Sequence, residues 1–191
     1  MRPLFPSPLE GNDMATPTKS APAEEQYPLI FRLITEPKIG SAFIRYFSWS
    51  PYSHIDLVLP PDAPLPPPKA GTFLGARLKG GVAIRPTHYT KPTKELYVQF
   101  MFSKEDAMKG YHFAYDQLGK PYDFRAILAF PFHFLAKPTD GTKWFCDELS
   151  TSIMKAAGKI MYAREPFSRL TPRDDAIWPG WTVISKPSWV T

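Results

Sequence analysis

The chain contains a single cysteine, Cys146, which lies between an aromatic pair and a helix-like run over 147–158. A thiol in the first turn of a helix faces unsatisfied backbone N–H groups and the positive end of the helix dipole, and both stabilise a thiolate. Because the thiolate is the attacking form of cysteine, this position predicts a nucleophile. A lone cysteine is also commonly a small buried apolar residue, and the sequence alone leaves that alternative open.

A catalytic cysteine needs a base, and His54 is the strongest candidate among four histidines. The run over 53–59 alternates in polarity, which is typical of a strand with two different faces. The alternation places His54, Asp56 and Val58 on one face, where the polar pair is predicted to line a cleft. The alternative for a histidine at the start of a strand is a structural, hydrogen-bonded role.

Four segments in a fixed order resemble the circularly permuted branch of the NlpC/P60 papain-like cysteine hydrolases, which includes YiiX-like and lecithin retinol acyltransferase-like proteins. The similarity spans roughly residues 50 to 175, and His54 precedes Cys146, as in the permuted members. The segments are SHIDLV at 53–58, FLGAR with GGVAIRP at 73–86, LGKPYDF at 118–124 and WFCDEL at 144–149.

The resemblance implies an α+β, permuted papain-like fold in which a small antiparallel sheet packs against helices and the nucleophile lies at a helix N-terminus. The residue patterns agree with this fold. Ser103 is predicted to cap the helix that follows it. The apolar segment 124–135 contains Pro131, so it is predicted to be kinked or broken, and it is too short to span a bilayer. Strands are predicted around 29–34, 54–59, 72–77, 82–85 and 95–102, and a helix over 39–47.

The third catalytic residue departs from the pattern that the resemblance implies. Permuted relatives often carry a Glu or His on the strand after the histidine strand, and here Gly75 occupies that place. Asp56 is the predicted substitute, since it shares a strand face with His54 and its carboxylate can hold the imidazole in the required tautomer. The alternatives are a solvated Asp56, an ion pair with Arg77 or Arg85, or a dyad completed by a carbonyl or water.

These residues predict acyl transfer. His54 would accept the thiol proton, Cys146 would attack an acyl carbon, and the acyl-enzyme would pass its acyl group to water, an amine or an alcohol. The Cys146 backbone N–H is the predicted oxyanion donor. Tyr52 and Tyr122 are candidate second donors, although packing is the simpler role for each.

Acidic residues directly after the cysteine work against a thiolate. Asp147 and Glu148 suit the first turn of a helix, yet a negative charge beside the sulfur raises the pKa of the thiol. No metal or cofactor is expected, because the sequence has neither the Cys-x-x-Cys nor the His-x-x-x-His spacing that zinc uses. His88, His112 and His133 are assigned surface or core roles.

Composition predicts one catalytic domain over 28–191 behind a disordered, proline-rich tail over 1–27. The tail lacks the apolar core of a signal peptide, so a cytoplasmic or phage-associated protein is expected. A single cysteine excludes an internal disulfide. The net charge of +5 lacks a basic run typical of nucleic-acid binding, but it favours contact with an anionic cell envelope. The proline-rich loop over 60–68 is predicted to wall the cleft or to be an inert insertion.

Two functions follow from these residues. The first is a cysteine hydrolase or acyltransferase that cleaves an amide or ester in a cell-wall peptide or a lipid acyl substrate. The second is a catalytically inactive papain-like binding or assembly module, which Gly75 favours.

Overall fold

The computed structural model describes residues 25–61, 72–129, 140–161 and 171–190. These residues form a mixed α+β structure built on one six-stranded antiparallel sheet, in the order β4-β3-β2-β1-β5-β6. The strands are β1 (Gln26–Thr35), β2 (His54–Leu59), β3 (Thr72–Arg77), β4 (Gly81–Arg85), β5 (Lys94–Ser103) and β6 (Thr182–Ile184). The helices are α1 (Ile39–Ser48), α2 (Lys104–Asp116), α3 (Phe124–Ala129), α4 (Cys146–Ala156) and α5 (Pro172–Ile177).

The predicted strands lie where the residue patterns placed them, with β2 and β3 having the predicted bounds. Strand β1 begins at Gln26, within the last two residues of the predicted tail, and pairs from there with Ser103 of β5. Ser103 caps α2 by accepting a hydrogen bond from the Asp106 backbone N–H at 3.2 Å. The patterns missed α5 and β6, which are short. The second part of the predicted 124–135 segment and most of the 60–68 loop lie outside the described residues.

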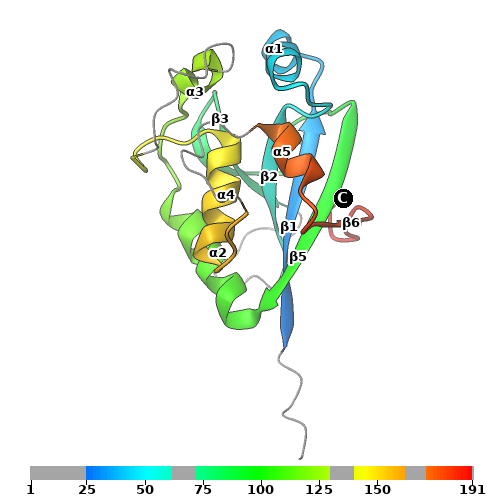
Figure 1. Ribbon diagram of the computed structural model, residues 1–191, viewed down its shortest axis with the longest axis vertical. Helices are drawn as coiled ribbons and strands as arrows, with labels where there is room; N and C mark the ends of the chain where they lie inside the picture. Colours follow the sequence, from blue (N-terminus) through cyan, green and yellow to red (C-terminus); the bar gives the residue numbers. More distant parts are fainter. Residues whose placement is uncertain (1–24, 62–71, 130–139, 162–170, 191) are drawn as a thin grey trace, which may run out of the picture.

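Helices α2 and α4 cover one face of the sheet (Figure 1). The β2 side chains Ile55, Leu57 and Leu59 alternate toward this face and are all buried there. Full burial of each such side chain stabilises the fold by about 1.5 to 3 kcal/mol. The opposite face holds a smaller apolar cluster that includes Val58 and Phe73, so β2 is buried on both sides. Because its two faces contact different groups, the register of β2 is strongly specified.

The same end of the molecule gathers α1, α3 and the N-terminus of α4 (Figure 1). Helix α1 fills the connection between β1 and β2 and is followed by the cap residue Trp49, which has a left-handed φ of 52°. Strands β3 and β4 join through a tight turn in which Gly80 and Gly81 have positive φ, as the glycine pair predicted. Within the part of the chain that the structure describes, no helix is long and apolar enough to cross a membrane.

The N-terminus of α4 is held by a buried acid. The Phe145 backbone N–H donates to Glu148 Oε2 at 3.2 Å, while Glu148 Oε1 has no hydrogen-bond partner among the described residues. Burial raises the pKa of Glu148 to about 7, against the opposing effect of the Phe145 N–H. An acid whose pKa is higher in the folded state binds its proton more tightly there, so its contribution makes the fold less stable as pH rises.

We therefore expect Glu148→Gln to change how stability depends on pH. Between about pH 4.5 and 7 the wild type should lose up to about 3 kcal/mol that the variant keeps, since Gln accepts the same hydrogen bond without ionising. Urea unfolding of both proteins below and above this window measures the difference. Parallel pH profiles for the two proteins would contradict the assignment.

Candidate active site

His54 and Asp56 are paired, as the strand alternation predicted. His54 Nε2 lies 2.7 Å from Asp56 Oδ1, and both side chains are buried. Asp56 Oδ2 accepts a second hydrogen bond from the Tyr89 hydroxyl at 2.5 Å. Burial by itself would raise the pKa of Asp56, but His54, Arg77 and Tyr89 together hold it well below its usual value. Asp56 is thus an ionised carboxylate directed at the imidazole.

Gly75 leaves the space that this carboxylate occupies. A Cβ built on Gly75 would lie 2.2 Å from Asp56 Oδ1 and 3.4 Å from His54 Nε2. The glycine therefore does more than remove the acid expected on this strand. It makes room for a carboxylate that reaches the imidazole from β2.

Arg77 contacts the imidazole from β3. Its Nε lies 3.1 Å from His54 Nε2, and its Nη1 donates to Glu36 Oε2 at 2.9 Å. Asp56 and Arg77 compete for one nitrogen, because Nε2 either donates to the carboxylate or accepts from the guanidinium. The shorter contact to an ionised carboxylate favours the proton on Nε2. That tautomer leaves Nδ1 free to accept a proton.

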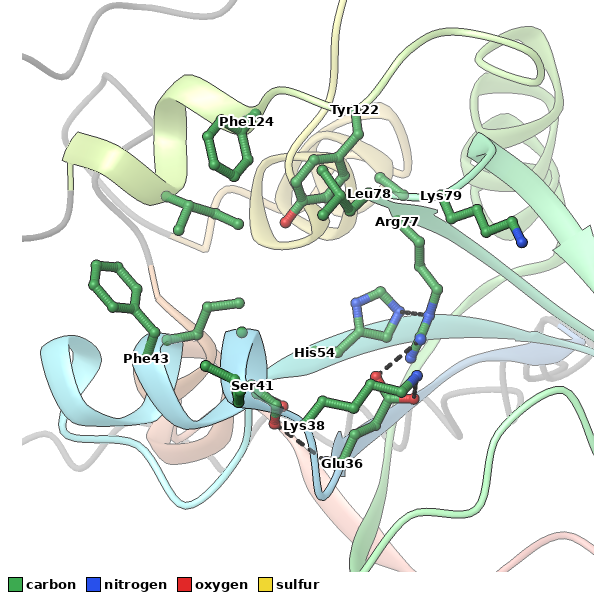
Figure 2. A pocket seen from close by; sticks show the side chains of 16 residues that line it. Glu36, Lys38, Ser41, Phe43, His54, Arg77, Leu78, Lys79, Tyr122 and Phe124 are labelled. Atoms are coloured by element: carbon green, nitrogen blue, oxygen red, sulfur yellow. Dashed lines mark hydrogen bonds and ion pairs between the residues drawn. The ribbon is translucent and has the colours of Figure 1, made fainter.

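The imidazole is neutral at rest, and one of its nitrogens faces a cavity. Burial and then the charge of Arg77 lower the pKa of His54, although Asp56 opposes them. The ring nitrogen that is not bonded to Arg77, Nδ1, points into a cavity (Figure 2). A neutral histidine with an unprotonated, accessible nitrogen has the form of a general base.

The cavity has a volume of about 600 Å³ and lies between α1 and α3 (Figure 2). Its walls are mostly apolar, and the cationic side chains Lys38 and Lys79 join Arg77 in the lining. The apolar lining residues are Ile39, Phe43 and Ile44 of α1, Ala76 and Leu78 of β3 and its turn, and Tyr122, Phe124 and Ile127 beside and within α3.

Cys146 begins α4, as predicted, but its sulfur does not line the cavity. The side chain is buried, with 2% of the residue exposed, and Sγ donates to Asp147 Oδ2 at 3.3 Å. The sulfur adjoins the Ile55 backbone N–H, one residue from His54. Within the described residues its side-chain hydrogen bond goes to Asp147 and not to His54. The structure thus brings the predicted base and the predicted acid together and leaves the thiol beside them on the α4 side of β2.

The predicted thiolate is opposed by the surroundings of the sulfur. Burial and then Asp147 raise the pKa of the Cys146 thiol well above its usual value, and the Ile55 N–H only partly offsets them. Burial and the like charge of Asp175 in turn raise the pKa of Asp147. Asp175, which the sequence patterns missed, is buried in α5 and accepts from Ser150 Oγ at 3.0 Å. The helix dipole is therefore outweighed, and the resting thiol is protonated.

The two candidate oxyanion tyrosines differ in position. Tyr122 lines the cavity, and its hydroxyl points into it (Figure 2). Burial and then charge on Cys146 raise the pKa of Tyr122, which places the phenol near the sulfur. Tyr52 is half-buried against the core and does not line the cavity. The other described histidines, His88 and His112, also lie outside the cavity lining, and His133 lies outside the described residues.

Comparison with known proteins shows the fold. The chain matches no family model and no curated protein. It is similar to the crystal structure of the metalloprotein YiiX from Escherichia coli O157:H7, with a TM-score of 0.58 and 17% sequence identity. The match covers 83% of this chain and 96% of that chain, so the fold is YiiX-like. In the described ranges, no three His, Cys, Asp or Glu side chains gather as a metal site.

We expect Gly75→Ala to displace the Asp56 carboxylate, because the new Cβ would overlap Oδ1. The variant should lose about 1 to 3 kcal/mol of stability. The pKa of His54 should also fall further, since Asp56 is the main group that raises it. Urea unfolding and NMR titration of the histidine measure the two effects. Gly40→Ala is the matched control, because a Cβ there meets nothing within 4 Å. A Gly75→Ala protein as stable as this control would contradict the assignment.

We expect Asp147→Asn to lower the pKa of the Cys146 thiol, because it removes the acid that receives the thiol hydrogen bond. Each unit of that decrease raises the thiolate population about tenfold at a pH below the pKa. The pH dependence of iodoacetamide alkylation, with folding checked by circular dichroism, measures the shift. Asp116→Asn, at the exposed end of α2, is the control. An unchanged alkylation profile in Asp147→Asn would show that this acid does not govern the thiol.

Proposed function

We propose that this chain is a cysteine hydrolase or acyltransferase of the permuted papain-like, NlpC/P60 type. The observation that carries the proposal is the buried His54–Asp56 pair at 2.7 Å, which leaves Nδ1 of the imidazole directed at a cavity. The order of the His and Cys motifs, the YiiX-like fold and the start of α4 at Cys146 support it.

The cavity favours an apolar acyl group as the substrate. Its wall is formed largely by aliphatic and aromatic side chains, which offer few hydrogen-bond partners for a peptide backbone. The cations at its rim suit a negatively charged group at the polar end of such a substrate. Of the two substrate classes predicted from the sequence, a lipid acyl ester or amide therefore fits better than a cell-wall peptide.

Catalysis in this site begins with a rotation of the Cys146 side chain away from Asp147. His54 Nδ1 then takes the thiol proton, and Sγ bonds to the acyl carbon. The Cys146 backbone N–H and the Tyr122 hydroxyl are the oxyanion donors. As the tetrahedral centre collapses, the bond to the alcohol or amine breaks and the imidazolium returns the proton to it. Water or an acceptor then releases the acyl group from sulfur by the reverse sequence.

A non-catalytic acyl-binding module is the second candidate. The observation that favours it is the sulfur, which is hydrogen-bonded to Asp147, protonated at rest and absent from the cavity lining. A binding module would use the same cavity without turnover.

Acyl transfer to Cys146 distinguishes the two. Intact-mass spectrometry after exposure to p-nitrophenyl esters should show an acyl adduct that forms faster with long than with short acyl chains. Cys146→Ser should abolish the adduct, and His54→Ala should slow its formation about a hundredfold or more. His112→Ala is the control, because His112 is exposed on α2. Ester binding without any adduct in the folded wild type would leave the binding module as the function.

A further inference from the structure

Helix α1 buries Ile44 in the core but also exposes apolar side chains that an ordinary surface helix would bury. Ser41 and Ser48 are buried, whereas Ile39 and Tyr46 are 93% and 75% exposed. Trp49, the cap residue that follows, is 81% exposed. Positions 39, 42, 43, 46 and 49 follow the three- and four-residue spacing of one helix face, and all five are exposed. An apolar and aromatic stripe therefore faces solvent along the whole helix.

The stripe continues onto the other walls of the cavity mouth. Leu78, in the turn after β3, is 67% exposed, and Phe124 of α3 is also exposed. Both residues line the cavity together with Ile39 and Phe43 of the stripe. Apolar surface thus surrounds the opening at one end of the molecule, where α1 and α3 lie on either side (Figure 1). Contiguous apolar patches of this kind mark interaction sites.

The charges around this end are mainly positive. Lys38 precedes α1, and its side chain is 64% exposed. Lys79, in the β3–β4 turn, and Arg125, on α3, are also exposed. The acid in the cavity wall, Glu36, is largely buried and is paired with Arg77 and Lys38. Aromatic side chains with a polar edge, such as Tyr and Trp, are favoured where apolar and aqueous phases meet. Basic residues beside an apolar helix face are favoured at anionic lipid surfaces.

We propose that the α1 stripe docks this protein onto the surface of an anionic lipid bilayer, with the cavity mouth facing the membrane. Ile39, Tyr46 and Trp49 insert among the headgroups, and Lys38 and Lys79 contact lipid phosphates. The docking surface does not depend on the chemistry of Cys146, so it is tested separately from the proposed acyl transfer.

Co-sedimentation with vesicles tests the proposal. The full chain carrying Cys146→Ser should bind vesicles of phosphatidylcholine mixed with phosphatidylglycerol, and bind pure phosphatidylcholine more weakly. The double variant Tyr46→Ser/Trp49→Asn should lose about tenfold or more in affinity, since it removes two interfacial aromatic side chains. Asn is chosen at 49 because it tolerates the left-handed backbone there. Neither residue lines the cavity.

Matched controls distinguish docking through the α1 stripe from non-specific binding of exposed apolar side chains to lipid. Ile160 and Val183 are 68% and 66% exposed, and neither lines the cavity, so Ile160→Ser/Val183→Ser should bind vesicles like the parent. Lys79→Glu should weaken binding to anionic vesicles, whereas Lys186→Glu, beyond the β6 edge of the sheet, should not.

Three results would overturn the proposal. The first is no binding of the folded parent to anionic vesicles. The second is equal loss of binding in the α1 double variant and its control. The third is sedimentation as a dimer that the α1 variant abolishes, without vesicle binding, which would make the stripe an interface between two copies of the chain.

Discussion

The buried carboxylate of Asp56 is the constraint on which the site depends. An ionised group is stable inside a protein only when charges and hydrogen bonds compensate for the lost water. His54 and Tyr89 contact its two oxygens, and the charge of Arg77 adds to them. Arg77 in turn is paired with Glu36, at the end of β1. The missing side chain at Gly75 provides the room, so one glycine fixes how the imidazole is oriented.

This arrangement gives β2 two faces with separate tasks. Ile55, Leu57 and Leu59 pack against the helices, whereas His54 and Asp56 belong to the alternate face with its charged network. The thiol approaches β2 from the helix side, next to the Ile55 backbone. Burial and the acidic pair Asp147 and Asp175 keep that thiol protonated. A buried, neutral thiol resists oxidation and unspecific alkylation, so in the proposed mechanism reactivity arises only after the sulfur turns toward the base.

The local patterns of the sequence were sufficient for strands β1 to β5 and for the His54–Asp56 pair, because alternation at β2 and the turn at Gly80 are properties of neighbouring residues. They were insufficient for the thiol, whose surroundings include Asp175 from a distant and very short helix. The cavity walls were also missed. They come from α1, the β3–β4 turn and α3, which only the tertiary fold brings together. The role of Gly75 became clear only from the structure, because the sequence does not show which side chain fills the space that a glycine leaves.

The proposed substrate and the proposed docking surface are linked by one physical requirement, because a long acyl chain is costly to expose to water. Moving a long chain through water exposes apolar area at about 25 cal/mol per Å², so a cavity that opens directly onto lipid avoids that cost. The exposed face of α1 and the inner wall of the cavity share Ile39 and Phe43, so the path is continuous. His54 Nδ1 and the Tyr122 hydroxyl both face that cavity. An acyl group that enters between α1 and α3 would therefore meet the proposed proton acceptor and the proposed oxyanion donor first, and the thiol would be the last group to join the site.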